Sequence, residues 1–152
     1  MKAMKIVLED KAVYLRLSAV NLAQYAKDIG SGGNTLFAVM DALDNLDKQG
    51  ALFSAALTYK GNPNEIHSGY DLIDMLADAE YGPLDVKQLI VELAEDAGIM
   101  SKVDAARVLT AIKAGSERVY EAAVAILSGD MSSLPGTFQN ADDGANTAEN
   151  PT

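Results

Sequence analysis

The sequence predicts an α+β fold that is mostly α: an N-terminal β-hairpin packed on a bundle of about five to six helices, with a long C-terminal helix. Apolar and polar residues alternate near the N-terminus, as in a half-buried strand, and apolar residues then recur at helical spacing as far as Leu127. Glycine and proline clusters divide that helical stretch. We expect one domain over residues 1–127 and a disordered acidic tail over 128–152.

The predicted hairpin covers residues 4–17. In its second half the apolar Val13, Leu15 and Leu17 alternate with other residues, and the polar segment 9–11 supplies the turn. Because an isolated hairpin is marginally stable in water, we expect it to lie on the helices.

Three helices are predicted before the middle of the chain, over about residues 18–29, 35–44 and 46–59. Ser18 and Asn34 are suitable N-caps for the first two. The glycine-rich segment 30–33 ends the first helix. Gly50 weakens the first turns of the third helix.

The sharpest pattern is a pair of amphipathic helices over about residues 69–80 and 83–97. Ser68 caps the first helix, with Asp71 at the position of a loose capping box. Pro83 suits the first turn of the second helix, and Gly98 suits its C-terminal end. The short connection between them predicts antiparallel packing of one helix on the other.

The last predicted helix spans about residues 102–127, with Ser101 as its N-cap. Its apolar stripe keeps its phase across Gly115, which favours one helix; the alternative is a kink at Gly115 that folds the second half onto the core. A long helix often projects and packs on a partner, so we expect its stripe to be a protein-interaction surface; the alternative is that these are core residues, and this is favoured for the first three. The stripe consists of Val108, Leu109, Ile112, Val119, Ala123 and Ile126.

Net charge and composition exclude several classes of ligand. A net charge of −10 argues against binding to nucleic acid or anionic lipid. The chain has no cysteine, which excludes disulfides and thiolate metal sites and fits a reducing cytoplasm. We expect no signal peptide and no membrane span, because no apolar run has the required length.

No catalytic, cofactor-binding or metal-binding residues are predicted, so we expect the chain not to be an enzyme. His67, the only histidine, precedes a capping serine in a turn and has no obvious orienting partner. Asp71, Asp74 and Asp78 share a helix face, but calcium sites usually draw their oxygens from a loop. The segment 30–33 lacks the lysine and the spacing of a phosphate-binding loop.

Residues 5–100 resemble the tail assembly chaperones of long-tailed bacteriophages, in the form found in phages and prophages of Gram-positive bacteria. The resemblance depends on KIVLEDKAVYLRLSAVNLAQYAKDIG, on ALFSAALTYKGNP and on the paired helices that end in ELAEDAGIM. Within those helices, Asp71-Leu72-Ile73-Asp74, Leu89-Ile90 and Gly98 fit the family pattern. The region 102–152 departs from it, because family members often end soon after the paired helices.

The resemblance implies a non-catalytic role in virion morphogenesis. Such chaperones bind the tape measure protein, help to recruit tail tube subunits, act in the host cytoplasm and are not part of the mature virion. Neither nucleic acid nor a membrane is an expected partner, and a homo-oligomer is compatible with the sequence. An alternative from the net charge is an acidic DNA mimic or regulatory protein that blocks a nucleic-acid-binding protein.

Overall fold

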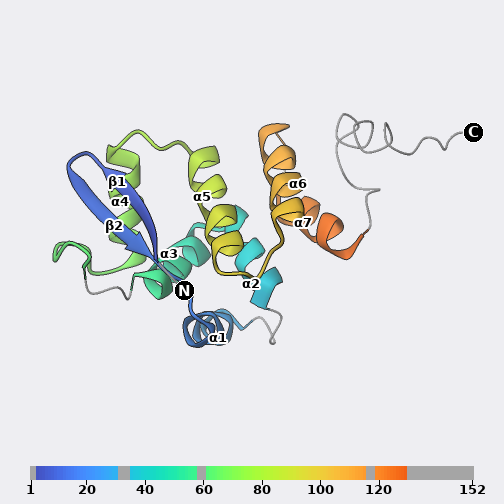
Figure 1. Ribbon diagram of the computed structural model, residues 1–152, viewed down its shortest axis with the longest axis horizontal. Coiled ribbons are helices and arrows are strands. Elements are labelled where there is room, and N and C mark those ends of the chain that lie inside the picture. The colour runs from blue at the N-terminus through green and yellow to red at the C-terminus, as the bar shows by residue number, and fades with distance from the viewer. Residues whose placement is uncertain (1–2, 31–34, 58–60, 116–118, 130–152) are drawn as a thin grey trace, which may run out of the picture.

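The computed structural model describes residues 3–30, 35–57, 61–115 and 119–129, and the backbone alone at 119–121. It is mostly helical with an N-terminal two-stranded hairpin, so the α+β prediction is confirmed at this level (Figure 1). The elements in chain order are β1 (Met4–Leu8), β2 (Lys11–Leu15), α1 (Ala19–Asp28), α2 (Thr35–Asp41), the 3₁₀ turn η1 (Ala42–Asp44), α3 (Leu46–Ala56), α4 (Gly69–Asp78), α5 (Pro83–Asp96), α6 (Lys102–Lys113) and α7 (Val119–Ser128).

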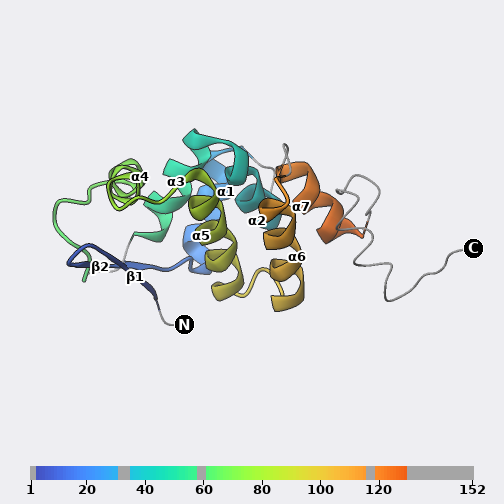
Figure 2. The ribbon, with the colours of Figure 1, turned by 90° about the horizontal axis from the view of Figure 1, so that it is seen from above.

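The hairpin turns at the predicted polar segment. Leu8 pairs with Lys11 across a two-residue loop, and Glu9 takes a positive φ of 57° there. The two strands are antiparallel, and alternate side chains, such as Val13 and Leu15, are buried on one face. The hairpin lies in front of α4 in Figure 1, and Figure 2 shows the same arrangement from above.

Three helices begin at a serine cap, as predicted. The hydroxyl of Ser18 accepts a hydrogen bond from the backbone N–H three residues later, and the hydroxyls of Ser68 and Ser101 do the same. The carboxylate of Asp71 accepts from the backbone N–H of His67 at 2.7 Å, one residue before the cap. The predicted cap at Asn34 lies outside the described residues, whereas the helix predicted over about 46–59 ends at Ala56, with Leu57 as its C-cap.

The prediction that the two central helices pack on each other is wrong. α4 packs mainly on α3, whereas α5 packs mainly on α6. The connection between α4 and α5 includes Glu80, at a positive φ of 67°, and Gly82, in an extended conformation, so it separates the helices instead of folding one back onto the other. Figure 1 shows α4 behind the hairpin and α5 to one side of it.

Two glycines explain the preference of α4 for α3. A Cβ added at Gly69 would lie 2.0 Å from the carbonyl oxygen of Gly50 and 2.6 Å from the amide nitrogen of Ser54. The Gly69 N–H also donates to the Ser54 hydroxyl at 2.7 Å. A Cβ at Gly50 would lie 2.4 Å from the ring of Tyr70. Gly50 is therefore a close-packing position, although the sequence indicated only a weakened helix start.

The predicted continuous helix over 102–127 is not observed. α6 ends at Lys113, and Gly115 takes a left-handed φ of 78°, a conformation that stops a helix. α7 then packs on α6, α2 and η1, so the alternative in which the second half folds back onto the core fits the structure. Each of the two helices buries one apolar face in the same core, so a shared apolar phase across Gly115 does not require one continuous helix.

The core extends through the hairpin and all the helices of the described chain. Its largest fully buried side chains include Tyr25 and Phe53. The Tyr25 hydroxyl donates to the carbonyl oxygen of Ala38 at 2.9 Å, which joins α1 to α2. Burial, with a smaller contribution from the nearby carboxylate of Asp41, raises the pKa of the Tyr25 phenol above its ordinary value.

Candidate protein-interaction surfaces

The stripe predicted as an interaction surface lies largely in the core. Val108 and Ile112 of α6 are buried, and so are Ala123 and Ile126 of α7. Leu109 is partly buried and packs against the same core, and the side chain of Val119 lies outside the described residues. These four buried side chains hold α6 and α7 in place, so a partner cannot reach them in this folded state.

The polar residues considered for chemistry are not brought together. His67 is exposed, and Asp71 is occupied by its bond to the His67 N–H. Asp74 and Asp78 are exposed on α4. Over residues 3–30, 35–57, 61–115 and 119–129 there is no group of three or more histidine, aspartate or glutamate side chains placed to hold a metal ion. Of the segment 30–33, only Gly30 is described.

The outer edge of β2 is closed by other parts of the chain. The Tyr14 N–H donates to the Asn62 side-chain oxygen at 2.6 Å, and the Asn62 side-chain nitrogen donates to the Tyr14 carbonyl at 2.9 Å. The Arg16 N–H donates to the Ala56 carbonyl at 3.0 Å. The amide of Asn62 therefore takes the place of a neighbouring strand, which protects this edge from pairing with another chain.

The outer edge of β1 is open. Because the N–H and C=O of Tyr14 point toward Asn62, Tyr14 and its partner Lys5 form a non-hydrogen-bonded pair. The N–H and C=O of Lys5, and those of Val7 two residues later, therefore point away from β2. No hydrogen bond from another described residue to these groups is observed. Val7 is also 59 % exposed.

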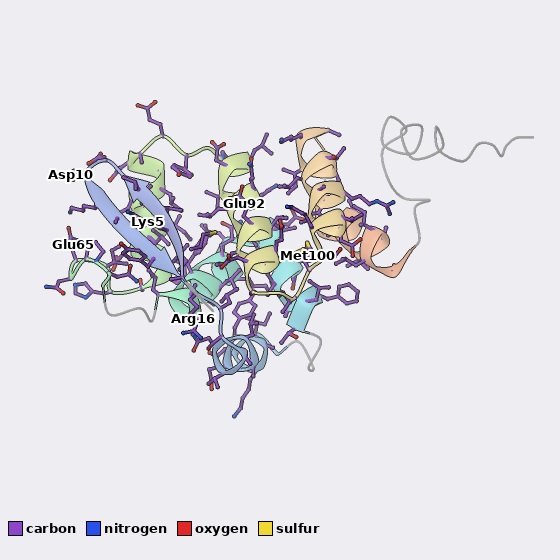
Figure 3. All side chains as sticks on the ribbon, in the orientation of Figure 1. Lys5, Asp10, Arg16, Glu65, Glu92 and Met100 are labelled. Carbon is purple, nitrogen blue, oxygen red and sulfur yellow. The ribbon has the colours of Figure 1, made fainter. Side chains whose placement is uncertain are left out.

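A cavity of about 390 Å³ lies beside this open edge, between β1, the α4–α5 connection and α5. Figure 3 shows β1, with Lys5, and α5, with Glu92, on its two sides. Its apolar lining comes from both elements and from the connection. The lining residues are Ile6, Ala79, Glu80, Tyr81, Asp85, Gln88, Leu89 and Glu92.

The charge of this cavity, called the β1 cavity below, is one-sided. Glu80, Asp85 and Glu92 contribute carboxylates, and no lysine or arginine is among its lining residues. Asp85 also accepts a hydrogen bond from the Gly82 N–H at 2.7 Å, which fixes its position at the start of α5. Three carboxylates around an apolar floor favour a cation with an aliphatic stem.

A second cavity of about 170 Å³ lies near the hairpin turn, against α4. It is lined by Leu8, Glu9, Lys11, Glu65, Met75 and Asp78. The Lys11 ammonium pairs with the Glu65 carboxylate, so this cavity already contains a cation. It therefore offers a weaker site for a basic group than the β1 cavity.

Large apolar side chains are exposed on several helices. Val20 of α1 is 77 % exposed and Val103 of α6 is 63 % exposed; Leu46, Tyr70 and Leu84 are also exposed. Tyr70 belongs to the α3–α4 contact region, since the Tyr70 hydroxyl donates to the Asp47 carbonyl at 3.1 Å. The sequence did not single out these residues, because isolated apolar side chains on a helix are common at any protein surface.

Comparison with known proteins adds no relative. No protein-family model matches the sequence, no curated protein is significantly similar to it, and no solved structure matches its fold significantly. Within the described residues, no helix combines the length and apolar character needed to cross a membrane.

Proposed function

We propose that this chain is a non-catalytic tail assembly chaperone of a long-tailed bacteriophage or prophage. It binds the tape measure protein and helps to recruit tail tube subunits in the host cytoplasm, without remaining in the mature virion. The observation that carries this proposal is the order of elements between Met4 and Gly98: a hairpin, a serine-capped helix, further helices and two consecutive helices separated by residues 79–82. This is the order expected from the resemblance.

The surface chemistry supports a role in binding protein clients. Exposed apolar side chains such as Val20 and Val103 offer contacts to the apolar faces of a helical client. A net charge of −10 keeps a chaperone soluble while such contacts are open. The client surface is expected among these exposed residues, because the buried α6–α7 stripe is committed to the core.

Co-expression with the tape measure protein of the same genome tests the proposal. We expect the chaperone to keep the tape measure protein soluble and to co-purify with it. Val20→Asp and Val103→Asp, which add a charge at exposed apolar positions, are expected to weaken the complex. Ala23→Asp, at another exposed position of α1, is the matched control because it adds the same charge without removing a large apolar side chain. A tape measure protein that stays insoluble with wild-type chain, with no complex formed, would refute the proposal.

A further inference from the structure

Only one of the two outer edges of the hairpin is hydrogen-bonded to another part of the described chain. Asn62 satisfies the outward N–H and C=O of Tyr14 on β2. On β1 the corresponding groups of Lys5 and Val7 have no partner among the described residues. An unpaired strand edge is a template for an added strand, and several peptide-binding domains use such an edge.

The pairing pattern determines which side chain of an added strand enters the β1 cavity. An antiparallel strand hydrogen-bonded to Lys5 and Val7 places its intermediate residue opposite Ile6. Side chains alternate between the two faces of a sheet, so this intermediate residue points to the same face as Ile6. Ile6 lines the β1 cavity, and the intermediate side chain therefore enters it.

We propose that β1 binds an extended segment of a partner protein as a third strand, with a lysine or arginine of that segment inserted into the β1 cavity. The aliphatic stem of this residue lies against Leu89 and Tyr81. Its charged group reaches the carboxylates of Glu80 and Glu92. The backbone bonds to Lys5 and Val7 provide affinity, and the cavity provides selectivity for a basic residue. This inference concerns a peptide class and is independent of the proposed chaperone function.

Two other occupants of the β1 edge can be compared with a basic segment of a partner protein by their charge: the C-terminal region of this chain and a second copy of the chain. The C-terminal region of the chain has no lysine or arginine after Arg118 but carries several acids, so the β1 cavity would repel it. A second copy that added its own β1 edge would direct Met4, Ile6 and Leu8 toward the cavity face, because its Lys5 and Val7 side chains point to the opposite face. Neither occupant supplies a cation, whereas a basic segment of another protein does.

Binding of designed peptides to the full-length chain tests the proposal. The probe is a short labelled peptide of alternating threonine and valine with one central arginine, and its affinity is measured by fluorescence anisotropy. The first control peptide has glutamate in place of arginine. The second keeps the arginine but carries N-methyl groups on the two flanking amides, which blocks strand pairing. We expect the arginine peptide to bind on the order of tenfold more tightly than the glutamate peptide, with the difference reduced by salt.

Protein variants locate the binding site. Val7→Pro removes an outward N–H that β2 does not use, and we expect it to weaken the arginine peptide about fivefold or more. Val7→Thr is the matched control, because it changes the exposed side chain but keeps the N–H. Glu80→Gln and Glu92→Gln are each expected to weaken binding roughly two- to fivefold. In NMR spectra of the wild-type chain, the backbone amide signals of Lys5 and Val7 should shift when the arginine peptide binds, and these amides should become protected from hydrogen exchange.

Several results would overturn the inference. The arginine and glutamate peptides binding equally well would show that the β1 cavity does not select a cation. If the N-methylated peptide binds as tightly as the unmethylated arginine peptide, strand addition is excluded. This comparison uses only the wild-type chain, so it remains valid even if Val7→Pro does not fold. Exchange protection of Lys5 and Val7 in the free monomer would identify another segment of the chain as the occupant, and protection only in a dimer would identify a second copy. None of these results involves the tape measure protein, so they leave the test of the chaperone proposal separate.

Discussion

Replacing Gly69 with alanine tests the contact between α3 and α4, on which the placement of both helices depends. The new Cβ would lie 2.0 Å from the Gly50 carbonyl oxygen and 2.6 Å from the Ser54 amide nitrogen. Comfortable separations between such atoms are about 3.5 Å, so the helix axes must separate by roughly 1 Å or more. Both contacting atoms belong to the backbone, and no side-chain rotation can relieve the clash.

The expected cost of Gly69→Ala has two parts. Overpacking of a well-packed contact costs about 1–3 kcal/mol, and a clash between backbones is expected to lie at the upper end of that range. Separation of the helices also breaks the 2.7 Å bond from the Gly69 N–H to the Ser54 hydroxyl, which contributes about 1 kcal/mol. We expect a total loss of about 3–4 kcal/mol, equivalent to roughly 6–16 °C in Tm for a chain of this size.

Urea denaturation followed by far-UV circular dichroism measures this loss, with Gly82→Ala as the matched control. Gly82 has a φ of −81°, and its added Cβ would meet its nearest atom, an Asp85 carboxylate oxygen, at 3.5 Å. The control is therefore expected to stay within about 1 kcal/mol of wild type. If Gly69→Ala also stays within that range, α3 and α4 are not in backbone contact, and the explanation given for their pairing fails.

Three further substitutions test other features. Tyr25→Phe leaves the Ala38 carbonyl without its donor and should cost about 1–2 kcal/mol by denaturation. Because the folded-state pKa of Tyr25 is raised, wild-type stability should be retained below pH ~10 and decline above it, and the variant should lose that part of the decline. Asn62→Ala should cost about 1–2 kcal/mol and speed hydrogen exchange at the Tyr14 amide, and an unchanged rate would exclude the edge role. Gly115→Ala should cost about 1 kcal/mol because of its left-handed φ, whereas a continuous helix would instead gain about 1 kcal/mol.

Local features were predictable from the sequence because they depend on neighbouring residues. The serine caps at Ser18, Ser68 and Ser101 and the turn of the hairpin follow from short-range chemistry, and the structure confirms them. The choice of packing partner was not predictable in this way. A close approach at Gly69 depends on which helix lies opposite, and the sequence gives no signal that distinguishes α3 from α5.

The open edge of β1 could not be predicted from the sequence either, because it also depends on contacts between residues that are far apart in the chain. The alternation in residues 4–17 identifies a hairpin but not which strand is covered, since Asn62 reaches Tyr14 from 48 positions further along the chain. The continuous phase across Gly115 was misleading, because two helices that each bury one face can share a phase by chance. A positive φ at glycine is a backbone property that the apolar pattern does not encode.

The burial of the α6–α7 stripe changes which variants can map a client surface. Ile126 is 5 % exposed, so a charge placed there must be buried or must detach α7. Loss of a client in that variant would therefore report unfolding as readily as a lost contact. Val103 lies on the exposed side of α6, so a charged side chain at this position stays in solvent. Loss of the client in a Val103 variant would therefore report a lost binding contact and not unfolding. The same reasoning applies to Val7 on the hairpin, which is also exposed. Substitutions at exposed residues can therefore change the affinity for a partner without changing the stability of the fold.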